Sequence, residues 1–272
     1  MIRLGVVSFL NSRPLIEGLE HRAGVECVFD VPARLPRLLD QGAVDAALVP
    51  VVDLLRSDAA LAVVSDGCIG CDGETMTVRI FSQVPPDRIR SLRLDSDSHT
   101  SVALARILWR ELYDRELNLE PFDPRQQPAD QFESVLLIGD KVVDPARGRF
   151  AYEVDLGGAW RQHTGLPFVF AVWACRAERL SAARRRELSE LLSAARDRGV
   201  RRAAEIADVE GPRLGWPVEL ARRYLTRCLL YRLDQRCVAG ANLFAQRCAE
   251  LGIVPAGAEI AWPSSLLAGQ CV

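Results

Sequence analysis

Short apolar runs alternate with amphipathic segments along the first fifty residues. Residues 3–7, 25–29 and 44–50 are apolar runs of strand length, and residues 36–41 have the spacing of a short amphipathic helix that ends at Gly42. Such close alternation of strand and helix predicts a parallel or mixed sheet with helices on both faces. Ligands of such sheets usually bind beyond the carboxyl ends of the strands, so functional residues are expected there.

The alternation restarts after a proline-rich break at residues 83–87. A second set of strand and helix patterns follows, and a long apolar run at residues 167–174 precedes segments with helical character. We therefore predict an α/β chain with two lobes of the type II periplasmic-binding-protein-like fold, with mixed sheets, helices on both faces and a ligand cleft between the lobes. The predicted first lobe comprises residues 1–83 and 172–272, and the second comprises residues 84–171.

The composition argues against several classes of partner. Among 272 residues, 34 basic and 36 acidic side chains leave a net charge of −2, so no overall field attracts nucleic acid or an anionic membrane. The N-terminal segment lacks the features of a secretory signal, and no apolar run reaches the roughly 20 residues of a membrane span. We expect a cytoplasmic protein whose eight cysteines are free thiols. The sequence leaves the oligomeric state open, and a homodimer is compatible with it.

Two polar segments follow predicted strands and precede helical patterns. The first contains Ser8, Asn11 and Ser12, and the second contains Ser98, His99, Thr100 and Ser101. Hydroxyl, amide and free backbone N–H groups at such places can bind a carboxylate, although helix capping is the simpler role for each segment. Both segments face one cleft in the predicted fold, which favours a shared binding site. Four aspartates also lie near strand ends, where an acid or base would be useful and a turn is the simpler role: Asp45, Asp66, Asp72 and Asp140.

The sequence lacks the common motifs of metal and nucleotide sites. Cys68 and Cys71 have the spacing of a zinc or redox pair, yet no second half-site accompanies them and the three histidines are scattered. No Walker loop, G-x-G-x-x-G fingerprint or G-x-S-x-G motif is present. We therefore expect no metal, no nucleotide and no other cofactor.

Seven segments of the chain resemble one known family. They are GVVSFLNSRPL, GAVDAALVPVVD, DGCIGCDG, DSDSHTSVALARIL, LLIGDKV, DLGGAWRQHTGLPFVFAVWA and YLTRCLLYRLDQRCVAGANLFAQRC. In this order they are similar to the chorismate dehydratases of the futalosine route to menaquinone, over nearly the whole chain. The resemblance implies the two-lobed fold, the absence of metal and nucleotide, and the conversion of chorismate into 3-[(1-carboxyvinyl)oxy]benzoate and water.

The resemblance also implies roles for individual residues. Asn11 occupies the family's important polar position in the SFLN segment, Thr77 stands where the family usually has serine, and His99 stands where it often has arginine. We expect Asn11 and Thr77 to be catalytic, by hydrogen bonding the reacting hydroxyl or a developing charge. The expected substrate-binding residues are Ser8, Ser12, Ser98, His99, Thr100, Ser101 and Asp140. The proton acceptor stays unassigned, and the substrate's own side-chain carboxylate is a candidate for it.

Three alternative functions are weighed against this interpretation. A non-catalytic solute-binding protein would share the fold, but the sequence shows no export signal. The later naphthoate-forming cyclase of the same pathway also shares the fold, but its N-terminal segment differs from the SFLNSRPL found here. A ligand-sensing regulatory domain is expected to carry a DNA-binding domain as well, for which the two predicted lobes leave no residues.

Overall fold

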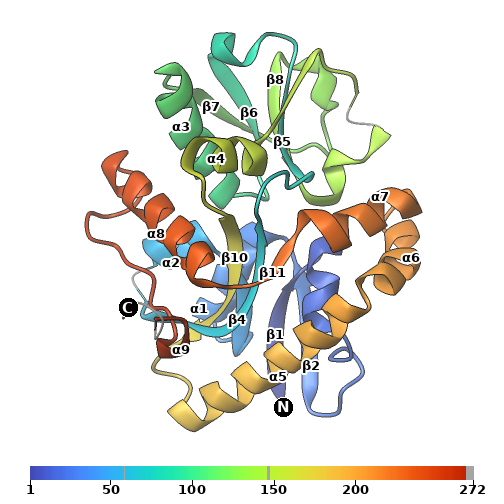
Figure 1. Cartoon of the computed structure of the whole chain (residues 1–272), viewed down its shortest axis with the longest axis vertical. Coiled ribbons are helices and arrows are strands. Elements are labelled where there is room, and N and C mark those ends of the chain that lie inside the picture. The colour runs from blue at the N-terminus through green and yellow to red at the C-terminus, as the bar shows by residue number, and fades with distance from the viewer. Residues whose placement is uncertain (58, 146–147, 268–272) are drawn as a thin grey trace.

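The computed structural model describes residues 1–57, 59–145 and 148–267. The chain forms two lobes, each built on its own sheet, which lie one above the other along the longest axis (Figure 1). The first sheet has the strand order β11-β4-β10-β3-β1-β2, and the second has the order β7-β6-β8-β5-β9. The predicted two-lobed α/β architecture is therefore confirmed.

The elements have the following bounds. The strands of the first sheet are β1 (Ile2–Val7), β2 (Val25–Asp30), β3 (Ala46–Pro50), β4 (Leu61–Cys71), β10 (Phe168–Arg176) and β11 (Leu230–Arg232). Those of the second sheet are β5 (Val78–Ser82), β6 (Ser91–Asp95), β7 (Asn118–Phe122), β8 (Ser134–Ile138) and β9 (Tyr152–Asp155). The α-helices are α1 (Leu35–Asp40), α2 (Val51–Arg56), α3 (Thr100–Tyr113), α4 (Leu156–Thr164), α5 (Ala182–Arg201), α6 (Ala203–Arg213), α7 (Val218–Arg223), α8 (Gln235–Glu250) and α9 (Ser264–Leu267). Three short turns matter for the site: the 3-10 helices η1 (Leu10–Ile16) and η5 (Gly139–Val142) and the π-helical turn η7 (Tyr224–Cys228).

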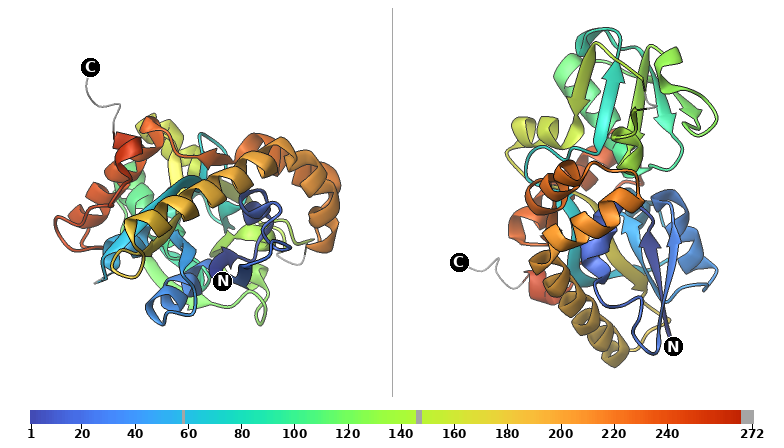
Figure 2. Two further views of the ribbon diagram at one scale, coloured as in Figure 1. Left: turned by 90° about the horizontal axis from the view of Figure 1, so that it is seen from below. Right: turned by 90° about the vertical axis from the view of Figure 1, so that its right-hand side faces the viewer.

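Both sheets are mixed. In the first, β1 pairs in parallel with β2 and β3, whereas β10 runs antiparallel to β3 and β4. In the second, β6 is parallel to β7 and β8, whereas β5 is antiparallel to β8 and β9. Helices lie on both sides of the first sheet (Figure 2), with α1 against β1 and β3 and α5 against β4. The N-terminus lies at the end of the first lobe remote from the second (Figure 1), so the carboxyl end of β1 points toward the second lobe.

The chain crosses between the lobes earlier than the sequence predicts. Strand β5 pairs with β8 and β9, so the first crossing lies between β4 and β5 and not after residue 83. Strand β10 pairs wholly within the first sheet, so the return precedes Phe168 and not residue 172. The proline-rich break forms the 3-10 helix η3 (Pro86–Arg88) inside the second lobe, because proline marks a turn whether or not the chain changes lobes there. Residues 268–272 of the predicted first lobe lie outside the described residues.

Two segments of the first lobe have local structure that matters here. Cys68 and Cys71 lie inside the long strand β4. Residues 218–231, within the region of helical character, divide into α7, η7 and β11. Pairing of β11 with β4 satisfies backbone groups of both strands, and such tertiary hydrogen bonding overrides a local helical pattern.

Thr77 lies in the first crossing, the segment between β4 and β5. Asp155, at the end of β9, accepts hydrogen bonds from the backbone N–H groups of Thr75 (2.9 Å) and Met76 (2.7 Å). The same carboxylate caps α4 by accepting from the Gly158 N–H at 2.9 Å. Met76 has a φ of 68°, an uncommon value for a non-glycine residue, and the two hydrogen bonds hold the backbone there. One carboxylate thus fixes the segment from which Thr77 projects.

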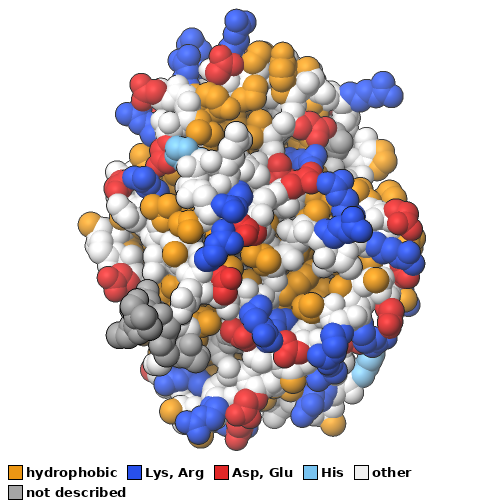
Figure 3. All heavy atoms as spheres, viewed as in Figure 1, with side chains coloured by type: hydrophobic (Ala, Val, Ile, Leu, Met, Phe, Trp, Pro, Cys, Tyr) orange, Lys and Arg blue, Asp and Glu red, His pale blue; other side chains and the backbone are white. Residues whose placement is uncertain are grey.

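The surface agrees with the nearly balanced charge of the sequence. Basic and acidic side chains are interspersed over the face shown in Figure 3. Of the helices within the described residues, none has both the length and the apolar character needed to cross a membrane.

Close packing of α5 against η1 supplies a first test of the fold. A Cβ atom added to Gly199 of α5 would overlap the backbone carbonyl of Pro14 in η1, and backbone yields less readily than a side chain. We expect Gly199→Ala to lower the free energy of unfolding by at least about 2 kcal/mol, measured by urea denaturation.

The matched control is Gly158→Ala in α4. The nearest atom to a Cβ at Gly158 is 3.7 Å away, so this variant is expected to be neutral or more stable by up to about 1 kcal/mol. Equal stabilities for the two variants would contradict the packing described here.

Candidate active site

A cavity lies between the two lobes. Its walls come from the loop after β1, the first crossing, the start of α3 and the turn η7. The non-atom space between these walls, open solvent included, is about 520 Å³. Its polar lining includes Asn11, Thr75, Thr77, Ser98, His99, Thr100, Ser101 and Tyr224. Six of the nine site residues predicted from the sequence therefore meet at one cavity.

Asn11 reaches the cavity from the first lobe. It lies in η1, directly after the loop that ends β1, and only 9% of its surface is exposed. Its side-chain oxygen Oδ1 is buried and has no hydrogen-bond partner within the protein. A buried amide oxygen without a partner is costly. A ligand hydroxyl in the cavity would satisfy it.

Thr77 reaches the cavity from the first crossing. Its hydroxyl forms a hydrogen bond of 2.6 Å with the hydroxyl of Tyr224, which begins η7. Both side chains are almost completely buried. Burial raises the pKa of the Tyr224 phenol above its ordinary value, and the hydrogen bond with Thr77 acts in the opposite direction. Tyr224 therefore stays protonated and neutral at physiological pH.

The start of α3 forms the wall on the second lobe. The Ser98 hydroxyl accepts a hydrogen bond from the Ser101 N–H at 3.3 Å, which is the capping role considered from the sequence. The Thr100 hydroxyl accepts from the Val52 N–H of α2 at 3.3 Å, so it links the two lobes. Each hydroxyl keeps a proton that it can donate to a ligand.

His99 forms a second contact between the lobes. Its Nδ1 atom lies 2.9 Å from Oδ2 of Asp53 in α2. This pairing fixes the orientation of the imidazole ring at the cavity wall. His99 is also the one histidine in the lining, and no lysine, arginine, aspartate or glutamate of the described residues lines the cavity. The N-terminal amides of α3 can therefore supply partial positive charge for a bound carboxylate, and the His99 ring lies beside them in the lining.

Ser8 and Ser12, which were expected to bind substrate, are not among the residues that line the cavity. The Ser12 hydroxyl donates to the carbonyl oxygens of Val7 (2.5 Å) and Phe9 (3.1 Å) and is fully buried. The backbone N–H of Ser8 donates a hydrogen bond to the Asp30 carbonyl oxygen at 3.0 Å. The Ser12 hydroxyl therefore bonds to local backbone carbonyls, whereas the simpler role expected from the sequence was helix capping; η1 has no side-chain cap.

Asp140, which was also expected to bind substrate, is not among the residues that line the cavity, although its neighbour Gly139 is. Its Oδ1 atom accepts hydrogen bonds from the Leu10 N–H (3.2 Å) and from Nε1 of Trp216 (2.9 Å). The ring of Trp216 stacks on that of Tyr224, with centroids 4.9 Å apart and an interplanar angle of 11°. Asp140 thus supports the loop that carries Asn11 and, through Trp216, the ring of Tyr224.

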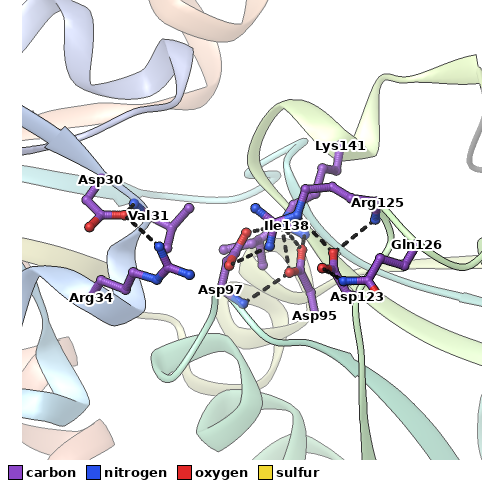
Figure 4. Close-up of polar contacts among 10 residues, drawn as sticks. All are labelled: Asp30, Val31, Arg34, Asp95, Asp97, Asp123, Arg125, Gln126, Ile138 and Lys141. Atoms are coloured by element: carbon purple, nitrogen blue, oxygen red, sulfur yellow. Dashed lines mark hydrogen bonds and ion pairs between the residues drawn. The ribbon is translucent and has the colours of Figure 1, made fainter.

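A charged cluster holds the segment that precedes Ser98 (Figure 4). Lys141 lies between Asp95 and Asp97, with Nζ at 2.6 and 2.7 Å from their carboxylates. Asp95 also accepts from the Ile138 N–H at 3.3 Å, and the Asp97 carbonyl accepts from the Ala33 N–H of the first lobe at 3.3 Å. The cluster fixes the turn between β6 and α3, so it positions the hydroxyls at the start of α3.

The sequence analysis missed Asp53, Trp216 and Tyr224. Asp53 and Tyr224 lie in two of the segments that resemble the family, GAVDAALVPVVD and YLTRCLLYRLDQRCVAGANLFAQRC. This resemblance was the sequence feature that could have identified them as site residues. Trp216 carried no signal, since a single tryptophan between helices is usually a core residue. Among the described residues, no group of three or more histidine, cysteine, aspartate or glutamate side chains is placed to hold a metal ion.

The buried carboxylate of Asp140 gives the protein a testable pH dependence. Burial raises the pKa of Asp140 from 3.8 to about 6, with its hydrogen bonds acting in the opposite direction. The folded chain therefore binds this proton more tightly than the unfolded chain, and the resulting stability is present below about pH 4 and lost as the pH rises through 6. Asp140→Asn keeps the shape of the side chain without titrating. Relative to this variant, wild-type protein should lose up to about 3 kcal/mol of unfolding free energy between pH 4 and pH 7.

Urea denaturation of both proteins across this pH range measures the difference. Other titrating groups are common to both chains and cancel in the comparison. A stability difference that stays constant from pH 4 to pH 7 would show that Asp140 titrates normally.

Comparisons with known proteins agree with this fold. A family model described as menaquinone biosynthesis matches residues 2–250. The chorismate dehydratase of Thermus thermophilus is 31% identical over 265 residues, which span 89% of this chain and 93% of that protein. Among solved structures, a protein from Archaeoglobus fulgidus superposes with a TM-score of 0.73 at 16% identity, covering 93% of this chain and 98% of that one. The periplasmic aliphatic sulphonate binding protein of Escherichia coli superposes with a TM-score of 0.62 at 12% identity, covering 95% of each chain.

The two solved structures share the fold and confirm its periplasmic-binding-protein-like class. The family model and the Thermus relative each cover most of the chain, and they confirm the resemblance seen in the sequence. The chain belongs to the menaquinone biosynthesis family.

Proposed function

We propose that this protein is a chorismate dehydratase, a lyase that converts chorismate into 3-[(1-carboxyvinyl)oxy]benzoate and water on the futalosine route to menaquinone. Family membership and the named Thermus relative support this function. The observation that carries it is the cavity itself, where Asn11 and Thr77 face the hydroxyls at the start of α3. The proposal includes the predicted cytoplasmic location, and homodimer formation stays a prediction.

The reaction needs the removal of one proton and one hydroxide from neighbouring ring carbons. The C–H bond beside the ether oxygen breaks, its electron pair forms the new ring double bond, and the adjacent C–O bond releases the hydroxyl. The proton and the hydroxide leave together as water, so the atoms and electrons balance without an oxidant or reductant. Because the product ring is aromatic, the elimination is strongly downhill, and orientation of the substrate is the main task.

The cavity offers one set of donors for the leaving hydroxyl and a second set, at the start of α3, for the substrate carboxylates. The Thr77 hydroxyl and the Asn11 side-chain NH2 are assigned as donors to the reacting hydroxyl oxygen, which gains negative charge as its bond to the ring breaks, and Asn11 Oδ1 accepts from a hydroxyl of the bound substrate. Ser98, Thr100 and Ser101 are assigned to substrate carboxylates, together with the N-terminal amides of α3 and His99. Because these two sets of groups line the same cavity, one ligand can contact both sets.

The substrate's own side-chain carboxylate is assigned as the proton acceptor. No aspartate or glutamate of the described residues lines the cavity, and the Tyr224 phenol is protonated. The side chain of chorismate is attached through the ether oxygen to the ring carbon whose C–H bond breaks. Its flexible carboxylate can therefore reach that hydrogen. This assignment makes catalysis partly substrate-assisted.

Replacing Asn11 tests the proposal. Asn11→Ala removes the amide that is assigned to the leaving hydroxyl, and we expect kcat with chorismate to fall at least about 100-fold. The melting temperature should fall by no more than about 4 °C, because the variant removes an unpartnered oxygen together with one side-chain hydrogen bond to Tyr224. Product formation is followed by the absorbance of the aromatic ring and by chromatography.

Asn118→Ala is the control, since Asn118 is exposed on β7 of the second lobe. It should keep wild-type turnover. Unchanged turnover in Asn11→Ala would remove Asn11 from the mechanism. Binding of chorismate by wild-type protein without any conversion would favour the alternative, a solute-binding protein of the same fold.

A further inference from the structure

Two buried hydroxyls meet at the wall of the cavity. The oxygens of Thr77 and Tyr224 lie 2.6 Å apart, and the two side chains are 2% and 1% exposed. Each hydroxyl has one proton, and only one of the two protons can lie between the oxygens. The other proton is free to form a hydrogen bond elsewhere, and both side chains line the cavity.

The chemistry of the pair sets the direction of the shared proton. A phenol is a stronger acid than an aliphatic alcohol, so it is the better donor of the two. Tyr224 therefore donates to the Thr77 oxygen, and the proton of Thr77 is left to point into the cavity. Accepting a hydrogen bond also polarises the threonine hydroxyl and strengthens it as a donor.

Contacts within the protein also hold the ring of Tyr224 in place. Its ring stacks on Trp216, whose Nε1 donates to Asp140 at 2.9 Å. Asp140, in the second lobe, also accepts a hydrogen bond from the Leu10 N–H of the first lobe. Residues of both lobes therefore support the ring of Tyr224. Tyr224 is the first residue of the π-helical turn η7, and such turns in helical segments occur frequently at functional sites.

We propose that Tyr224 is a positioning residue for the dehydration, which donates its hydrogen bond to Thr77 and thereby directs the Thr77 proton at the leaving hydroxyl of the substrate. This inference rests on the proposed function. Neither residue gives up its proton in the net reaction: the C–O bond breaks, the hydroxide is stabilised by the Thr77 hydrogen bond, and the proton removed from the ring carbon completes the water. Tyr224 thus acts on the barrier through Thr77 and not by proton transfer.

Tyr224→Phe tests the inference, because it removes only the hydroxyl and keeps the ring on Trp216. We expect kcat to fall about tenfold, the effect of one neutral hydrogen bond, with KM for chorismate changed by less than about twofold. In a Thr77→Val background the same change should have no further effect, since the hydroxyl that Tyr224 orients is gone. In a Thr77→Ser background, which keeps a hydroxyl, the tenfold loss should return.

Tyr231→Phe is the matched control. Tyr231 is also buried, its hydroxyl has no hydrogen-bond partner, and it does not line the cavity. This variant should keep wild-type kcat and KM, so a loss of activity common to both variants would mark a general structural effect and overturn the inference.

The remaining outcomes separate the inference from the function. Wild-type conversion of chorismate combined with an unchanged kcat in Tyr224→Phe, or with independent losses in the Thr77→Val double variant, would overturn the inference alone. No conversion by wild-type protein would overturn both. Should Tyr224→Phe fail to fold, NMR of protein labelled at the phenol carbon of tyrosine gives a second measurement. In Thr77→Val the Tyr224 signal should shift while the other three tyrosine signals stay in place, and an unmoved Tyr224 signal would count against the pairing.

Discussion

One buried carboxylate, that of Asp140, joins the two lobes beside the cavity. It follows β8 in the second lobe and accepts hydrogen bonds from the Leu10 N–H and from Trp216. The preceding residue, Gly139, has a φ of +63°, and a Cβ there would overlap the ring of Phe9, so only glycine permits this close approach. Because a buried carboxylate is costly unless its oxygens are satisfied, the lobe arrangement that supplies both donors is favoured over others. The loop after β1 and the turn η7 take their positions from it.

The cavity that results from this arrangement relies on neutral donors. Hydroxyl and amide groups line it, while charged side chains such as Lys141 and Asp155 act behind the wall by holding backbone segments in place. Neutral donors placed in advance stabilise a developing charge without binding the uncharged hydroxyl strongly. For an elimination that forms an aromatic ring, this modest and well-oriented stabilisation matches the proposed chemistry.

Six residues that the sequence predicts for the site line one cavity, and there is a physical reason for this. Asn11 and the hydroxyls at the start of α3 follow strands whose carboxyl ends meet at the cleft, so strand position alone places them there. Ser12 occupies the same segment, but its hydroxyl turns toward the Val7 carbonyl, and no pattern of residue types distinguishes these two orientations. Thr77 was placed by family resemblance and not by spacing. The crossing before β5 was missed because the more conspicuous prolines lie inside the second lobe.

The amino-acid sequence by itself determined the alternation of strand and helix, the two lobes and the two polar segments that face the cleft, because the spacing of apolar residues encodes which face of each element is buried. The tertiary structure decided which hydroxyls enter the cavity and what supports them. Thr77 and Tyr224 are 147 positions apart in the chain, yet their oxygens lie within 2.6 Å. Such a contact depends on the combined packing of both lobes and the C-terminal helices, and local sequence patterns carry no record of it.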